Sequence, residues 1–186
     1  MAPILGILAS SITGGLVTDL GAMFPIQSYV VPSGGTASFT FSSIPSTYSH
    51  LQLRVLSKST TAGQTNIAIR FNSDTGNNYA WHQLYGDGAS AAASAATSTN
   101  LIRCIHSSND SNVFGAGVID VLDYANSNKY KTTRTLSGYD MNGSGGYIML
   151  RSGVWMSTSA ISSLTVVPES GNLAQYTSLA LFGVKA

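Results

Sequence analysis

Histidine is the side chain best suited to acid–base chemistry near neutral pH, and the chain has three, at His50, His82 and His106. Together with a serine and an aspartate, a histidine could form a hydrolytic triad, because geometry rather than chain order defines such a site. No G-x-S-x-G elbow occurs, and serine is so abundant that its presence carries no information. The three histidines also fall in three different strand-like segments. We therefore expect that the protein is not an enzyme.

Thiol and metal chemistry is equally restricted. Cys104 is the only cysteine, which excludes an intrachain disulfide, and the apolar run LIRCIH around it favours a buried thiol. A nucleophilic thiolate would need a stabilising neighbour, and strand alternation puts His106 on the same face. No His-x-His or HExxH pair is present. The sequence predicts no zinc site and no cofactor.

Oxygen ligands gather in the segment 72–78, NSDTGNN. Asn72, Asp74, Asn77 and Asn78 could bind Ca²⁺, although the segment lacks the charge density and the bidentate glutamate of an EF-hand loop. Asn and Asp side chains routinely accept hydrogen bonds from backbone N–H groups of their own turn. Asx-turn capping is therefore the favoured interpretation, with a cation site as the alternative.

Aromatic side chains cluster in the strand-like segment 79–86. Tyr79, Trp81 and Tyr85 share one face by alternation and could stack on the sugar rings of a glycan. The same residue types are enriched in cores and at subunit interfaces. Burial of these rings in the core or at a subunit interface is the favoured alternative.

Two acidic residues, Asp120 and Asp123, end an apolar segment just before Lys129, Lys131 and Arg134. Paired carboxylates can transfer protons, but residues three apart point to opposite faces of a strand. A cross-strand salt bridge to the following basic segment is the more economical role.

Strand-like segments bounded by Gly, Pro, Asn or Ser must position these residues. The expected strands are 27–31, 36–41, 50–58, 66–71, 79–86, 100–106, 113–124, 129–138, 146–156, 162–167 and 175–184. The Ala/Ser-rich segment 88–98 is expected to be an exposed loop. Alternation predicts inward side chains at Phe39, Phe41, Leu51, Leu53, Val55, Ile67, Ile69, Val118, Val121, Leu150, Leu164, Val166, Leu179 and Leu181. The pattern predicts an all-β fold, an antiparallel β-sandwich of jelly-roll type.

Composition supports a β fold and limits the partners. Glu169 is the only glutamate and charged residues make up 9%, whereas a helix-rich surface would carry many Glu and Lys. The net charge is +1 with no basic block, which argues against nucleic-acid binding. At 186 residues the chain is expected to form one main domain, residues 25–186.

The N-terminal segment, residues 1–24, resembles a signal peptide but lacks its parts. No Lys or Arg precedes Arg54, and Gly, Ser, Thr and Asp interrupt the apolar residues. No run approaches the ~20 apolar residues of a membrane-spanning helix, so no membrane insertion is expected. We interpret the segment as an uncleaved arm that docks on a partner. Its apolar contact residues are Pro3, Ile4, Leu5, Ile7, Leu8 and Ile12.

Several motifs carry a resemblance that spans nearly the whole chain. They are MAPILGILASSITG, FNSDTGNNYAWHQLYGDG, GVIDVLDYANSNKYKTTRTLSG, RSGVWMSTSAISSLTV and YTSLALFGVKA. Together they resemble a family of small virion structural proteins of tailed bacteriophages, including phages of cyanobacteria and marine bacteria. The resemblance implies a β-sandwich or jelly-roll domain on the exterior of the particle, a homotrimer, contacts with other virion proteins, and no enzyme activity. It also implies synthesis in the cytoplasm of the host bacterium.

Two locations on the particle fit this resemblance. A receptor-binding fibre generally needs a shaft of coiled-coil heptads or repeats, and the sequence shows neither. We therefore expect a capsid decoration or cement protein that stabilises the head. The alternative is a tail-fibre or baseplate module in which Tyr79, Trp81 and Tyr85 bind a host surface glycan.

Overall fold

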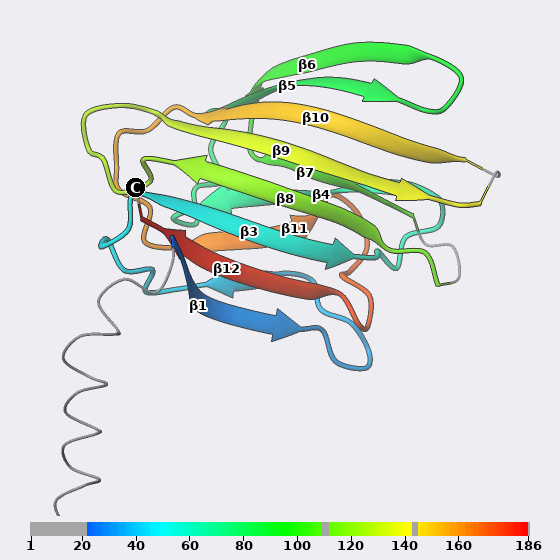
Figure 1. Ribbon diagram of the computed structural model, residues 1–186, viewed down its shortest axis with the longest axis horizontal. Coiled ribbons are helices and arrows are strands. Elements are labelled where there is room, and N and C mark those ends of the chain that lie inside the picture. Colours follow the sequence, from blue (N-terminus) through cyan, green and yellow to red (C-terminus); the bar gives the residue numbers. More distant parts are fainter. Residues whose placement is uncertain (1–21, 109–111, 143–144, 186) are drawn as a thin grey trace, which may run out of the picture.

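Two antiparallel β-sheets face each other in the computed structural model, which describes residues 22–108, 112–142 and 145–185 (Figure 1). The large sheet has the spatial order β1 (Met23–Val30), β12 (Ser178–Val184), β3 (His50–Ser57), β8 (Gly115–Leu122), β9 (Lys131–Asp140), β10 (Gly146–Trp155), β5 (Tyr79–Gly86) and β6 (Ala91–Thr99). The small sheet has the order β2 (Phe39–Phe41), β11 (Leu164–Pro168), β4 (Gln64–Phe71) and β7 (Ile102–Ser108). The predicted all-β sandwich is confirmed.

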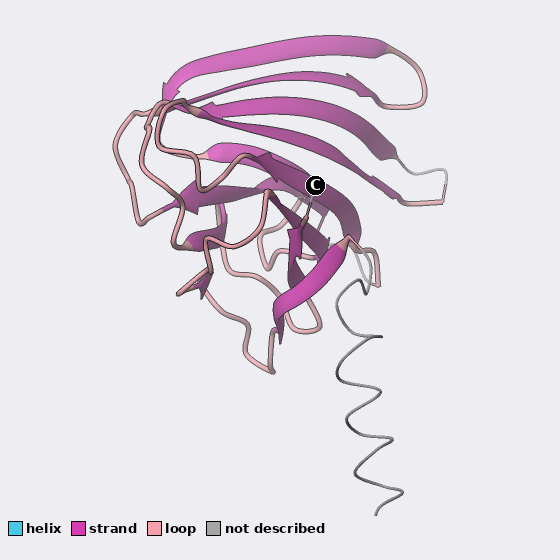
Figure 2. Cartoon of the chain, turned by 60° about the vertical axis from the view of Figure 1, so that its left-hand side comes forward, coloured by secondary structure: helices cyan, strands magenta, loops and turns pink. Residues whose placement is uncertain are grey.

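Strands and loops make up the whole described part of the chain (Figure 2). Short polar or glycine-containing turns join neighbouring strands, and all strand pairs within the two sheets are antiparallel. A search of these residues for a helix long and apolar enough to cross a membrane finds none.

The core lies between the sheets and follows the predicted alternation. The predicted inward side chains that are buried are Phe41, Leu51, Leu53, Val55, Ile67, Ile69, Val121, Leu164, Val166, Leu179 and Leu181, with Phe39 half-buried. Strand β7 approaches the large sheet closely because β8 and β10 present glycines to it. A Cβ on Gly117 would lie 2.7 Å from Ile105 Cγ1, and one on Gly153 would lie 2.6 Å from Ile102 Cγ2.

Two members of the predicted core, Val118 and Leu150, are wrong, because both point to solvent. On β8 the buried positions are Ile119 and Val121, and an even-numbered residue faces the opposite way. On β10 the inward positions include Arg151, so its neighbour Leu150 is turned outward. Both predictions were based on alternation, but alternation does not say which face of a strand is covered, and Val118 and Val121, three residues apart, cannot share a face.

The predicted loop at residues 88–98 is also wrong. Residues 91–99 form β6, which pairs with β5 from Gly86↔Ala91 to Tyr79↔Thr99. Asp87 closes the hairpin, since its Oδ1 accepts hydrogen bonds from the backbone N–H groups of Ala89 (2.9 Å) and Ser90 (2.7 Å). Alanine has low strand propensity, but pairing with a neighbouring strand overrides such preferences.

The boundary of the N-terminal arm also shifts. β1 begins at Met23, inside the arm expected at residues 1–24, and Phe24 packs on Tyr48 with ring centroids 5.8 Å apart. The backbone N–H of Lys185 donates to Ala22 O at 2.9 Å. The expected contact residues of the arm, from Pro3 to Ile12, lie outside the described residues.

Candidate functional site

Large apolar side chains lie in register on the face of the large sheet that points away from the small sheet. Val118, Leu136, Leu150 and Leu84, on β8, β9, β10 and β5, pair in that order across the strands. We call these four residues the apolar row. Their exposed fractions are 38%, 58%, 51% and 56%. Because each side chain is about half exposed, burial by a partner would stabilise each by about 1 kcal/mol, and the row is a candidate binding surface.

A groove lies beside the apolar row, at the end of the sheet where β1 finishes and β10 begins. Its volume is about 1190 Å³, larger than the roughly 300–1,000 Å³ of small-molecule pockets. Val30, Leu56 and Ile148 border it with exposed aliphatic side chains. Between Leu56 and Ile148 in the same cross-strand register stand only Ala116 and Gly138, whose small side chains leave the space open. Such a groove suits a chain segment with apolar side chains.

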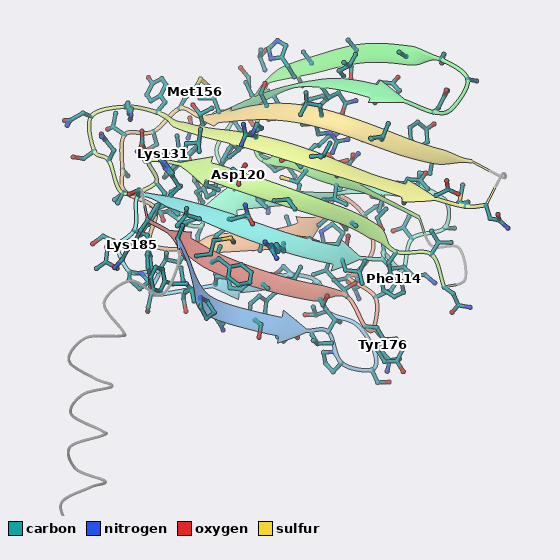
Figure 3. The ribbon with its side chains drawn as sticks, in the orientation of Figure 1. Phe114, Asp120, Lys131, Met156, Tyr176 and Lys185 are labelled. Carbon is teal, nitrogen blue, oxygen red and sulfur yellow. The ribbon has the colours of Figure 1, made fainter. Side chains whose placement is uncertain are left out.

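A polar row lies on the other side of the apolar row and consists of Gln52, Asp120 and Arg134, paired in register on β3, β8 and β9. Gln52 Nε2 donates to Asp120 Oδ1 at 3.0 Å, and Arg134 Nη2 donates to Asp120 Oδ2 at 2.9 Å. Asp120 lies on the exposed face near the C-terminal end of β8 (Figure 3). The predicted cross-strand ion pair is confirmed, and it leaves Asp120 without a free oxygen for proton transfer.

Asp123 forms a separate cluster with Lys129 and His50. Its Oδ2 accepts a hydrogen bond from Lys129 Nζ, which lowers the pKa of the Asp123 carboxyl, and its Oδ1 lies 3.5 Å from His50 Nδ1. The backbone N–H of Asp123 donates to His50 Nδ1 at 2.9 Å. The cluster holds the turn after β8 against the start of β3.

The described histidines do not come together. His50 begins β3 and His82 points outward from β5, and β8, β9 and β10 lie between the two strands. Four steps of about 4.8 Å separate them by roughly 19 Å. The side chain of His106 lies outside the described part of the structure. His50 and His82 therefore cannot belong to one common site.

The turn 72–78 is organised by Asp74. Its Oδ1 accepts the backbone N–H of Gly76 at 2.8 Å, and its Oδ2 accepts Asn78 Nδ2 at 3.0 Å and Trp155 Nε1 at 2.7 Å. The bond from Trp155, followed by those from Asn78 and Gly76, outweighs desolvation and lowers the pKa of Asp74. These contacts are the favoured Asx-type capping. Among the described residues, no group of three or more His, Cys, Asp or Glu could hold a metal ion.

The aromatic face expected at Tyr79, Trp81 and Tyr85 turns toward the small sheet. Tyr79 is fully buried, with its ring against Trp155 at 6.3 Å between centroids. Trp81 is 5% exposed and is covered by the Arg103 guanidinium, 5.0 Å from the ring centroid. These two rings therefore belong to the core, the favoured alternative, and cannot stack on a glycan in this arrangement.

The inner face of β9, beneath the apolar row, carries polar side chains. The usual arrangement of apolar residues inside and polar residues outside is therefore reversed on this strand. Lys131, Thr133, Thr135 and Ser137 are buried, whereas Leu136 is exposed. Ser137 Oγ donates to the carbonyl of Cys104 at 3.1 Å, and Lys131 Nζ donates to backbone carbonyls of the turns at this end of the sandwich. Leu136 lies on the surface although its strand buries polar residues, and it adds to the contiguous exposed apolar row.

β10 shows the same reversal as β9, because Arg151 is 3% exposed while its neighbour Leu150 faces solvent. Its Nε donates to Gln83 Oε1 at 2.6 Å and its Nη2 to Asn66 Oδ1 at 2.8 Å. Its Nη1 has no hydrogen-bond partner within the described part of the molecule. Burial lowers the pKa of Arg151 to about 10. Sequence reasoning missed the apolar row, although the alternation of Lys131, Thr133 and Thr135 with Leu136 was a signal of it.

Cys104 is fully buried between the sheets. Burial raises the pKa of its thiol to about 12, so it is protonated and unreactive in the folded protein at neutral pH. This agrees with the expected buried thiol.

Comparison with protein-family models, curated proteins and solved structures finds no match to the chain. The class that the structure itself defines is an antiparallel β-sandwich with an exposed, register-aligned apolar sheet face. That face and the sequence are the features of the chain that bear on its function.

Proposed function

We propose that this protein is a structural, non-enzymatic component of a tailed-bacteriophage particle and that it decorates and stabilises the outside of the capsid. The observation that carries the proposal is the apolar row with its groove. A surface of this kind on a nearly uncharged domain requires a partner to bury it, which fits a subunit that functions in an assembly.

Two further features support assembly rather than catalysis. Asp120 is paired with Arg134, and Asp123 is paired with Lys129. These pairs hold neighbouring strands and a turn together. The edge strand β6 is nine residues long, contains no charged residue or proline, and is exposed along most of its length. Edge strands of that kind readily pair with other chains.

The proposal predicts that the purified protein binds phage heads that lack it and raises their resistance to heat. Co-sedimentation measures binding, and release of DNA on heating measures protection. The variant Leu136→Asp, Leu150→Asp should protect less, whereas Tyr130→Asp, at an exposed residue outside the groove, should protect like the unchanged protein. Heads that neither bind the protein nor gain heat resistance would contradict the proposal.

The alternative is a tail-fibre or baseplate module that binds a host glycan. The burial of Tyr79 and Trp81 removes two of the three residues on which that alternative was based. Electron microscopy of virions labelled against this protein distinguishes the two locations. Label on tails, with binding to host polysaccharide, would favour the alternative over the capsid.

A further inference from the structure

We propose that the groove binds the N-terminal segment of a second copy of this chain, with residues 3–12 of one copy lying along the apolar row of its neighbour. This inference goes beyond the proposed function, because it concerns contacts between identical copies and does not depend on the particle to which they belong.

The chemistry of the segment matches that of the groove. Residues 1–21 contain no Lys or Arg and one acidic residue, Asp19. The apolar side chains concentrate in residues 3–12, PILGILASSI. The receiving surface is mostly aliphatic, and its three charged residues already have hydrogen-bond partners. Arg54 Nε donates to Gln52 Oε1 at 3.1 Å, Asp87 caps the β5–β6 turn, and Asp140 Oδ1 accepts the backbone N–H of Asn142 at 2.6 Å. An uncharged apolar segment can bury the aliphatic side chains while these groups keep their partners.

The lengths also match. The groove is lined from Val30 on β1 to Gly86 at the end of β5, and six strand steps separate these strands, roughly 29 Å at about 4.8 Å each. Ten residues in extended form span at most about 33–36 Å. Residues 3–12 can thus cover the groove, and residues 13–21 remain to link it to Met23 of their own copy.

The exit point of the segment favours a neighbour over the same copy. Ala22 is held by the N–H of Lys185, and Met23 and Val30 lie at opposite ends of β1. The polar row crosses the sheet between these two ends. To reach its own groove, the chain would have to reverse direction after Ala22 and run back along the length of β1. A groove on a second copy imposes no such path.

The test uses full-length protein and two complementary variants. The arm variant Leu5→Asp, Leu8→Asp has an intact groove, and the groove variant Leu136→Asp, Leu150→Asp has an intact arm. Sedimentation velocity should show that the unchanged protein and the control Tyr130→Asp self-associate with the same dissociation constant. Each double variant alone should associate roughly tenfold or more weakly, because an unpaired carboxylate would be buried in the contact.

Mixing the two double variants should restore a complex, because the intact arm of one meets the intact groove of the other. A mixture that stays monomeric would overturn the proposal and indicate docking within one copy. Association that survives the arm variant but is lost in the groove variant would instead indicate contact between two apolar faces. Melting curves check that each variant is folded. If the groove variant is unfolded, the milder Leu136→Ser replaces it in the same experiment. A groove variant that associates normally would also overturn the proposal.

Discussion

Two buried acids, Cys104 and Tyr79, respond most directly to their surroundings in the core. Burial raises the pKa of Cys104 from 9.0 to about 12, and that of Tyr79 from 10.0 to about 12. In the unfolded chain each group ionises near its ordinary pKa. In the folded protein it stays neutral up to a pH two to three units higher. Both groups therefore favour the folded state below pH 9, and this contribution is lost as pH rises toward 12.

We predict that the free energy of unfolding falls as pH is raised from about 9 to about 12. Denaturant titrations at a series of pH values measure it. Tyr79→Phe should reduce the slope above pH 10, whereas Tyr130→Phe, at an exposed tyrosine, should leave the slope unchanged. Equal slopes in both variants would show that the burial of Tyr79 does not control the alkaline transition.

Individual residues were predictable where the interaction was local or between neighbouring strands. The capping role of Asp74 follows from turn chemistry, and the pairing of Asp120 with Arg134 follows from the hairpin order of β8 and β9. The position of Trp81 was left open, because alternation says which residues share a face but not which face is covered.

At the scale of the strands, the close approach of β7 to the large sheet depends on glycine. Gly153 points inward on β10, where a Cβ would lie 2.6 Å from both Ile102 Cγ2 and Thr133 Oγ1. Gly86 points outward at the end of β5, where a Cβ would lie 3.7 Å or more from its neighbours. The same substitution should therefore have opposite effects at the two positions.

We predict that Gly153→Ala destabilises the protein by about 1–3 kcal/mol through overpacking. Gly86→Ala should be neutral or stabilising by up to about 1 kcal/mol, because alanine loses less backbone entropy on folding. Denaturant unfolding of both variants measures the difference. Equal stability of the two variants would contradict the tight contact between β7 and β10.

The strands themselves were largely predictable, because Gly, Pro and Asn punctuate segments of clear alternation. The boundaries of β5 agree to the residue, and most others differ by one to four residues. β6 was missed since nothing in an Ala/Ser run marks it as a strand until β5 supplies its hydrogen-bonding partner.

At the scale of the whole molecule, the proposed self-association would be driven by apolar burial rather than by charge, because the chain is nearly neutral and the receiving face is mostly apolar. Salt screens charge interactions but strengthens or leaves unchanged the burial of apolar surface. We predict that the self-association described above persists in about 1 M sodium chloride, where the Debye length is about 3 Å. Sedimentation in low and high salt measures it. Dissociation at high salt would assign the contact to charged groups such as Arg54 instead.

The sequence by itself determined the all-β class, most of the strands and most of the core, because period-two alternation and turn residues act locally. The tertiary structure decided which face of the large sheet is covered. The small sheet covers the face with Lys131, Thr133 and Arg151 and leaves Leu136 and Leu150 outside. Alternation places apolar residues on one face of a strand and polar residues on the other. It does not say which of the two faces is covered by the second sheet. Only the sheet that packs against the strand selects one.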